Sequence, residues 1–329
     1  MTRDLLFAVA AGVASALAGL AFLARAPGAT LLLIYLGPLP LMLTGLALGV
    51  RPALAACGVG ALVAGLLAGP LAMLLYVVGH ALPGALVVWL GLSRQPKVDI
   101  VVGDETGNGS TITPAEWYPH GHVVAWLAAL AAALIAAAAL ALSSGEGFQA
   151  AVAAHIEKGM AALLPTLGGA ERSPLVATMI GLFPGWIGVS WVAMGAVNAV
   201  MAEAVLIRTG RALRPKPVWS EITLPDWLSW LLVGAALLAL IGPGDVGYTG
   251  RNLALALAFP HFLLGLAVVH GLANRTPQPR ALLVGFYVVL FISAWALLVV
   301  AAVGVLEHWI GIRNRLPGGP RPGSNEPQA

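Results

Sequence analysis

Charged residues are scarce in this sequence. Asp, Glu, Lys and Arg make up 9% of its 329 residues, whereas 59% are hydrophobic. A soluble domain usually carries about a quarter charged residues, so this composition argues against a chain that folds in water. The apolar residues come in runs of about twenty, long enough for a helix to cross a hydrocarbon core. Lipid offers the backbone no hydrogen bonds, and the alternating pattern of a membrane β-barrel is missing. The sequence therefore predicts an all-α, polytopic transmembrane helix bundle.

Cysteine and recognisable catalytic motifs are also scarce. Because Cys57 is the single cysteine of the chain, an intramolecular disulfide is excluded. Its position between small residues predicts a packing role. The stretch Gly242–Gly247 fits the spaced glycines of a dinucleotide site, but it follows an apolar run instead of a strand, so we interpret it as a turn. His120 and His122 lie beside aromatic residues, a pattern more typical of an interfacial anchor than of a metal site. We expect no enzyme, no catalytic residue, no metal, no cofactor and no nucleic-acid partner.

Nine apolar runs, bounded by Pro, Gly or charged residues, predict eight or nine membrane spans. The runs cover residues 5–24, 30–50, 52–69, 71–92, 120–142, 174–207, 227–242, 252–273 and 280–305. The sixth run is too long for one upright crossing, so we expect a kink at Pro184 or a projection beyond the bilayer. Small residues four apart, such as Gly12 with Ala16 and Gly60 with Ala64, predict close packing between spans.

Polar segments divide the chain into regions. The division gives an amino-terminal region of four spans at 1–92, a polar loop at 93–119, a carboxyl-terminal membrane region at 120–315 and a disordered tail at 316–329. Within the third region, apolar residues alternate with His155, Glu157 and Lys158. This pattern predicts an amphipathic helix near 147–164 that lies on the membrane surface.

The basic residues predict the orientation in the membrane. Four of them form a cluster after the sixth run, namely Arg208, Arg211, Arg214 and Lys216. If this cluster is cytoplasmic, nine spans place the amino terminus, Arg51 and Arg94 on the same side. Arg313 and Arg315 then fall outside, whereas eight spans or a re-entrant segment would bring them inside. We expect a multi-pass protein of the bacterial cytoplasmic (inner) membrane.

Polar residues at membrane depth are the candidate ligand-binding residues. An ionisable group in hydrocarbon costs about 2.5–3.5 kcal/mol, so such residues must face protein or water. In the sixth run, Trp191 and Asn198 share one face. In the fourth run, Tyr76 and His80 share one face next to a kink expected at Pro83. A His80 that only bonds a carbonyl of a neighbouring helix is the structural alternative.

Three further candidates follow, two of them with plain structural alternatives. His261 follows Pro260 in the eighth run, where proline frees a carbonyl, as happens at midplane sites of transporters. Glu203 could bind a ligand or couple to protons, or it could pair with Arg208. Arg251 could bind an anionic group or anchor a helix end at the interface.

Two stretches of the chain resemble a known family. They are Tyr35–Gly49, which reads YLGPLPLMLTGLALG, and Phe259–His270, which reads FPHFLLGLAVVH and is followed by a final span and the Glu307–Arg315 segment. They resemble the YybS-like family of predicted bacterial membrane proteins. The amino-terminal part also resembles the S-components of energy-coupling-factor transporters, which bind a vitamin or metal and partner an ATPase module. That likeness rests on a Pro/Gly-rich helical pattern and implies no particular substrate.

Two hypotheses follow for the function. The first is a substrate-binding or transport-associated subunit with a midplane cavity. Its lining would be Tyr76, His80, Trp191, Asn198 and His261. Its partners would be membrane lipid and other membrane subunits or an ATPase module. The alternative is a non-catalytic scaffold or accessory subunit of a larger membrane complex, which the small-residue helix faces favour.

Overall fold

The structure is a computed structural model that describes residues 3–21, 27–96, 100–102, 110–112, 115–163, 174, 176–177, 179–216 and 222–315. Helices dominate these residues, and each of the nine predicted runs contains at least one helix. This confirms the all-α fold class. The predicted tail at 316–329 lies outside the described residues.

The described helices provide six or seven candidate membrane spans. Six segments are long and apolar enough, namely Ala29–Leu48, Val50–Ala68, Pro70–Gly91, His120–Leu142, Phe183–Arg208 and Gly244–Ala273. The ninth run, expected as one span, is instead two helices, α13 (Pro279–Ile292) and α14 (Ala294–Ile310), bent by 118°. The bend occurs because the backbone at Ser293 is extended and ends the first helix. Since α1 and α11 have only 17 and 16 residues, the predicted count of eight or nine is approximate.

The chain divides into two compact units. The first comprises Met1–Leu127 with Ser190–Pro217, and the second comprises Ala128–Val189 with Val218–Ala329. The divisions fall inside two helices, α7 (His120–Leu142) and α10 (Phe183–Arg208). Each of these helices therefore contributes residues to both units.

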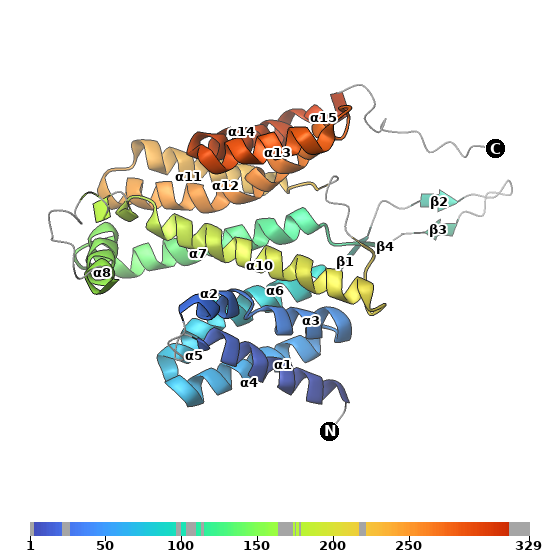
Figure 1. The fold of residues 1–329 in the computed structure, drawn as a ribbon, viewed down its shortest axis with the longest axis horizontal. Coiled ribbons are helices and arrows are strands. Elements are labelled where there is room, and N and C mark those ends of the chain that lie inside the picture. Colours follow the sequence, from blue (N-terminus) through green and yellow to red (C-terminus); the bar gives the residue numbers. More distant parts are fainter. Residues whose placement is uncertain are drawn as a thin grey trace. The chain divides into compact units, whose positions relative to one another are not determined.

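Small residues hold the first unit together. Its other helices are α1 (Arg3–Gly19), α2 (Pro27–Tyr35), α3 (Leu39–Leu48), α4 (Val50–Ala68), α5 (Pro70–Tyr76), the π-helix η2 (Val77–Ala81) and α6 (Leu82–Gly91). Helices α1, α3 and α4 lie side by side (Figure 1). A β-carbon on Gly12 of α1 would overlap the carbonyl oxygen of Ala56 and press on the amide of Gly60, both on α4. This contact confirms the packing role predicted for these glycines.

Two glycines make the turns between α3, α4 and α5. Gly49 lies at φ 105° and Gly69 at φ 87°, conformations that residues with a β-carbon rarely adopt. Each glycine ends one helix and precedes the first residue of the next. Runs two, three and four therefore follow one another with a single residue between consecutive helices.

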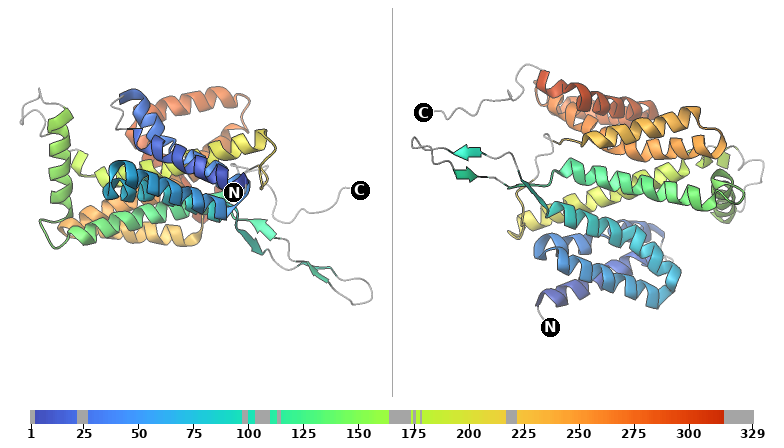
Figure 2. Two further views of the ribbon diagram at one scale, coloured as in Figure 1. Left: turned by 90° about the horizontal axis from the view of Figure 1, so that it is seen from below. Right: turned by 180° about the vertical axis from the view of Figure 1, so that it is seen from behind.

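The polar segment between α6 and α7 contains short antiparallel ribbons. Strand β1 (Arg94–Pro96) pairs with β4 (Ala115–Trp117), and β2 (Ile100–Val102) pairs with β3 (Ser110–Ile112) (Figure 2). The Arg94 guanidinium lies 4.5 Å from the ring centroid of its cross-strand partner Trp117, in cation–π range. We had expected only a loop here. The β-branched residues of β2 and β3 were the sequence feature that favoured pairing.

In the second unit, the backbones of two helices, α12 (Gly244–Ala273) and α14, are in direct contact. This unit holds the remaining parts of α7 and α10 with α8 (Phe148–Leu163), α11 (Asp226–Ile241), α12, α13, α14 and α15 (Ile312–Arg315). A β-carbon on Gly304 of α14 would overlap the carbonyl oxygen of His261 on α12. One on Gly265 of α12 would overlap the carbonyl oxygen of Val300 on α14. Only glycine permits this approach, which places Cα–H groups against carbonyls.

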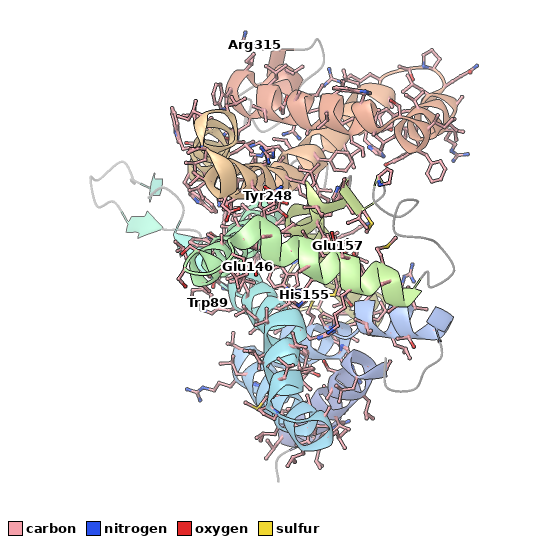
Figure 3. The ribbon with its side chains drawn as sticks, turned by 90° about the vertical axis from the view of Figure 1, so that its left-hand side faces the viewer. Trp89, Glu146, His155, Glu157, Tyr248 and Arg315 are labelled. Carbon is pink, nitrogen blue, oxygen red and sulfur yellow. The ribbon has the colours of Figure 1, made fainter. Side chains whose placement is uncertain are left out.

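Helix α8 is the predicted amphipathic helix. Phe148, Ile156 and Met160 are buried, whereas His155 and Glu157, both labelled in Figure 3, are exposed. The apolar side therefore packs within the second unit and the polar side faces outward, which confirms the amphipathic pattern, while the location of the helix on the membrane surface stays a prediction.

A carboxylate from α12 fixes the start of α8. Asp245 accepts hydrogen bonds from the backbone N–H of Phe148 at 2.7 Å and of Gln149 at 3.1 Å. The first N–H groups of a helix have no partner within it, and the helix dipole favours a negative charge there. Asp245 thus caps a helix that lies about a hundred residues earlier in the chain.

Candidate functional site

The second membrane run is broken between α2 and α3, and we call residues 36–38 the α2–α3 break. Pro38 has no N–H, so the carbonyl of Ile34 lacks the donor of a continuous helix and accepts instead from Gly37 N–H at 3.1 Å. The N–H of Leu39 donates to Leu36 O at 3.0 Å, which leaves the carbonyl of Tyr35 without its usual donor. Inside a membrane, the carbonyl of Tyr35 needs a donor from another group, and the second lone pair of Ile34 O can accept one more.

Two of the predicted site residues supply those groups. His80 on η2 lies with Nε2 3.0 Å from Ile34 O, and because a carbonyl only accepts, Nε2 carries the proton and donates. Asn198 on α10 donates from Nδ2 to Tyr35 O at 2.7 Å and to Met194 O at 2.7 Å. The structural alternative considered for His80, a bond to a neighbouring helix carbonyl, is therefore present.

Ser15 and Tyr76 satisfy the third carbonyl of the break. Tyr76 donates from its hydroxyl to Ser15 Oγ at 2.8 Å, and Ser15 in turn donates to Gly37 O at 2.6 Å. The Tyr76 ring stacks on His80, with centroids 5.5 Å apart. A β-carbon on Gly60 would overlap the Tyr76 hydroxyl, so glycine at that position makes room for the ring. These contacts hold α1, α4, α5 and η2 around the break.

A second interruption of the helix geometry lies in η2 and is satisfied by Trp191. In the π-helical register Leu82 donates its N–H to Val77 O, one residue further back than in an α-helix. The next residue in that register, Pro83, has no N–H for Val78 O. Trp191 of α10 donates its indole N–H to that oxygen at 3.1 Å. At the position of the kink expected at Pro83, the chain thus forms one π-helical turn that ends just before the proline.

Two buried acceptors next to these interruptions have no partner among the described residues. They are His80 Nδ1 and Asn198 Oδ1. Asn198 is 0% exposed and His80 is 7% exposed. The orientation of the Asn198 amide follows from its two carbonyl partners, which require Nδ2 to face them. Buried polar atoms almost always have a partner, so these two atoms call for an explanation.

Glu203 belongs to a separate charged group at the end of α10, which we call the Arg214 cluster (Arg214, Glu203 and His120). Arg214 donates to Gly91 O and Tyr118 O, each at 3.2 Å, and to His120 Nδ1 at 3.2 Å. A guanidinium cannot accept, so His120 Nδ1 is the acceptor and its proton lies on Nε2. That Nε2 is 3.4 Å from Glu203 Oε1, and Arg214 Nη1 is 3.7 Å from the same oxygen.

The Arg214 cluster bears on the alternative that Glu203 pairs with Arg208. Its cationic partner is Arg214, from the segment after α10, whereas Arg208 on the same helix is exposed. Burial lowers the pKa of the Arg214 guanidinium from its ordinary value, and the Glu203 carboxylate opposes that shift. Through Arg214, the pair thus connects the end of α10 to Gly91 and Tyr118, which flank the β1–β4 ribbon.

His261 lies in the second unit and is fully buried there. Its Nδ1 is 3.2 Å from Leu257 O and therefore carries the proton, so Ser229 donates to Nε2 at 3.0 Å. The His308 ring stands edge-on to it, with centroids 6.2 Å apart. His308 Nε2 also lies 3.2 Å from a carboxylate oxygen of the exposed Asp226. The polar atoms of His261 are thus both occupied within α11 and α12.

Arg251 is exposed at the start of α12, and its buried neighbours make the contacts of this helix end. Tyr248 donates to Ile180 O at 2.8 Å, and Asn252 Oδ1 accepts from Gly185 N–H at 2.8 Å. Asn252 thereby caps the first turn of α10. No described contact distinguishes the two readings of Arg251, and both remain predictions.

The structure groups the predicted site residues in three places. Tyr76, His80, Trp191 and Asn198 gather at the interruptions in the first unit, Glu203 joins the Arg214 cluster, and His261 and Arg251 lie in the second unit. Sequence reasoning missed Ser15, Ser229 and Asn252. Ser15 and Ser229 are polar residues inside predicted spans, and the rule that selected Asn198 would have found them. Asn252 opens the eighth run together with Arg251, and only the charged residue of the two was selected as a candidate.

Comparison with protein families gives a match. The family described as "Predicted membrane protein (DUF2232)" matches residues 13–307, which is most of the chain. Comparison with curated proteins and with solved structures gave no match.

Proposed function

The chain belongs to the DUF2232 family of predicted membrane proteins, and we propose that this integral membrane protein is a binding subunit whose ligand is held at the α2–α3 break. The observation that carries this proposal is the pair of buried acceptors without a partner, His80 Nδ1 and Asn198 Oδ1. An unsatisfied buried acceptor costs about 1–3 kcal/mol, and a ligand that donates hydrogen bonds would recover that free energy. Both acceptors belong to side chains that already hold the broken helix.

The broken helix supports a ligand site for a second reason. Many transporters hold small solutes and ions where membrane helices are interrupted, because the irregular backbone offers polar groups at membrane depth. Here the interruption in run two and the π-turn in run four are bridged by His80, and α10 reaches both through Asn198 and Trp191. The resemblance to S-components, which bind small molecules, agrees with this by analogy.

The chemistry of the site favours a donor-rich ligand. The side chains bonded at the two interruptions carry no fixed positive charge, namely Ser15, Tyr76, His80, Trp191 and Asn198. The groups left to contact a ligand are acceptors, which disfavour an anion and favour a group with several N–H donors. We propose a small primary ammonium compound as the ligand class.

Thermal unfolding of the purified protein with two probe cations tests the proposal. Methylammonium has three N–H donors, whereas tetramethylammonium carries the same charge and has none. We expect methylammonium to raise the unfolding temperature, by linkage to the folded state, and tetramethylammonium to leave it unchanged. Equal effects of the two cations would contradict a site made of hydrogen-bond acceptors.

Two variants separate binding from stability. Asn198→Ala removes one free acceptor, and a hydrogen bond to a charged donor contributes about 1.5–3 kcal/mol, so methylammonium should bind about 10-fold to 150-fold more weakly. Ser15→Ala breaks a bond to the same break without removing a free acceptor. It should lower the unfolding temperature and keep the methylammonium response. A response that survives in Asn198→Ala would refute the site.

The same protein also tests the scaffold alternative. If an ATPase module co-purifies with the protein in mild detergent, the result would agree with a binding subunit of the S-component kind. A stoichiometric complex with other membrane subunits, together with no response to methylammonium, would favour the accessory subunit.

A further inference from the structure

A groove of about 570 Å³ opens at one end of the first unit, away from the α2–α3 break. It lies between the start of α1, the last turns of α3 and the end of α10. Arg3, Asp4 and Arg211 provide its charges, and Thr44 and Thr209 provide hydroxyl groups. We call it the Arg3–Arg211 groove. Its volume falls within the roughly 300–1,000 Å³ that is usual for small-molecule sites.

The groove has a cationic rim and an apolar wall. The lining carries two guanidinium groups and one carboxylate, and Asp4 lies in the first turn of α1, where the helix dipole already favours it. The Arg3 guanidinium is 5.8 Å from the centroid of the Phe7 ring, in cation–π range. The wall includes Phe7, Leu48 and Val205, which are 46%, 36% and 43% exposed. A ligand that matches both parts must be anionic at one end and apolar at the other.

The backbone holds Arg211 at the rim. Gly210 lies at φ 66°, and its N–H donates to Ile207 O at 3.2 Å, while Arg211 N–H donates to Leu206 O at 2.9 Å. This is the Schellman arrangement that ends a helix at a left-handed glycine. The position of Arg211 next to the last turn of α10 therefore follows from the helix end, and only its side chain remains to adapt to a ligand.

The location of the groove indicates on which side of the membrane it lies and so which amphiphilic ligand it can bind. The exposed Arg208 ends α10 beside the groove, and Arg51 lies in the first turn of α4, the helix that follows α3. The positive-inside rule predicts that an end of the unit with so many basic residues faces the cytoplasm. Basic pockets between membrane helices on that side bind anionic lipid headgroups.

We infer that the Arg3–Arg211 groove binds an anionic phospholipid. Its phosphate accepts hydrogen bonds from Arg3 and Arg211, since a guanidinium presents paired donors that match phosphate oxygens. Its acyl chain lies along the wall that Phe7, Leu48 and Val205 form. The site is separate from the α2–α3 break, so it stands whether or not an ammonium compound binds there.

Native mass spectrometry of the full chain in a neutral detergent tests this inference. Short-chain phosphatidylglycerol is titrated against Arg3→Gln/Arg211→Gln and against the control Arg51→Gln, which removes an exposed arginine outside the groove. At about 1 kcal/mol for each basic residue, the double variant should bind phosphatidylglycerol about 30-fold more weakly. The control should bind it as the unmodified chain does. A loss in the control that is the same per charge removed, about 5-fold for its single arginine, would mean attraction to overall surface charge and would overturn the inference.

Two other probes identify the source of the phosphate. Short-chain phosphatidylcholine shares the acyl chains but has no net charge, and we expect it to bind more weakly than phosphatidylglycerol. Inorganic phosphate shares only the anion, and we expect it to compete poorly. Binding of phosphatidylcholine as tight as that of phosphatidylglycerol would overturn the anionic headgroup. Competition by inorganic phosphate at the same concentration as the lipid would show a site for free phosphate and overturn the lipid.

Discussion

Replacing Arg214 with methionine removes the cation from a buried cluster while keeping most of the side-chain volume. Arg214 and Glu203 are each 9% exposed, and the change leaves Gly91 O and Tyr118 O without their donor. Removal of one partner from a buried ion pair destabilises a protein by about 3–5 kcal/mol, because the other charge stays buried. The 3.7 Å separation from Glu203 and the nearby His120 soften this effect, so we expect the lower end, about 3 kcal/mol.

The size of the loss should depend on the geometry of the guanidinium. Arg214→Lys keeps the charge but cannot reach the three acceptors with one ammonium group, so we expect a smaller loss of about 1–2 kcal/mol. Adding Glu203→Gln to Arg214→Met removes the isolated carboxylate and should recover part of the stability. The coupling between these two positions is then the non-additive remainder of a double-mutant cycle.

The free energy of unfolding can be measured by titration with SDS, followed by far-UV circular dichroism. Lys216→Met is the matched control, because this exposed residue lies two positions further along and should change the free energy by less than about 0.5 kcal/mol. A loss below about 1 kcal/mol for Arg214→Met, or one equal to that of the control, would refute the structural role of the cluster.

Three further predictions concern packing, capping and topology. Gly304→Ala should destabilise by about 1–3 kcal/mol, since its β-carbon overlaps the α12 backbone, whereas Gly285→Ala has open space around it and should not; SDS titration measures both. Asp245→Ala should destabilise α8 by about 0.5–2 kcal/mol and speed amide exchange at its start, while Glu157→Ala on its exposed face should not. If α13 and α14 form a re-entrant hairpin, a cysteine at Arg315 should react with thiol reagents from the cytoplasmic side.

Each of these predictions can fail in a distinct way. Equal stability of the two alanine variants would mean that α12 and α14 can separate without loss. Unchanged exchange in α8 after the loss of Asp245 would mean that the cap does not hold the helix start. Labelling at position 315 only from the outer side would show that α13 and α14 cross the bilayer as one broken span.

The membrane fold could be predicted from the sequence because lipid imposes a local rule. Any stretch of about twenty apolar residues in hydrocarbon must satisfy its own backbone groups, and a helix does so whatever its neighbours are. The nine predicted runs therefore all contain helices, and the amphipathic α8 was evident from its alternation. The same rule selected Asn198, His80 and Tyr76 as polar residues that need partners inside the membrane.

What those residues bond was decided only by tertiary structure. Asn198 meets Tyr35 across 163 positions of the chain, and Tyr76 meets Ser15 across 61. Such pairs depend on which carbonyls a helix break sets free and on which glycines let two helices touch, and neither is a property of a short stretch of sequence. The bend at Ser293 and the choice of Arg214 over Arg208 as the partner of Glu203 belong to the same class. Composition thus determined the solvent and the helices, whereas packing determined which buried polar atoms are satisfied and which, such as His80 Nδ1 and Asn198 Oδ1, have no partner among the described residues.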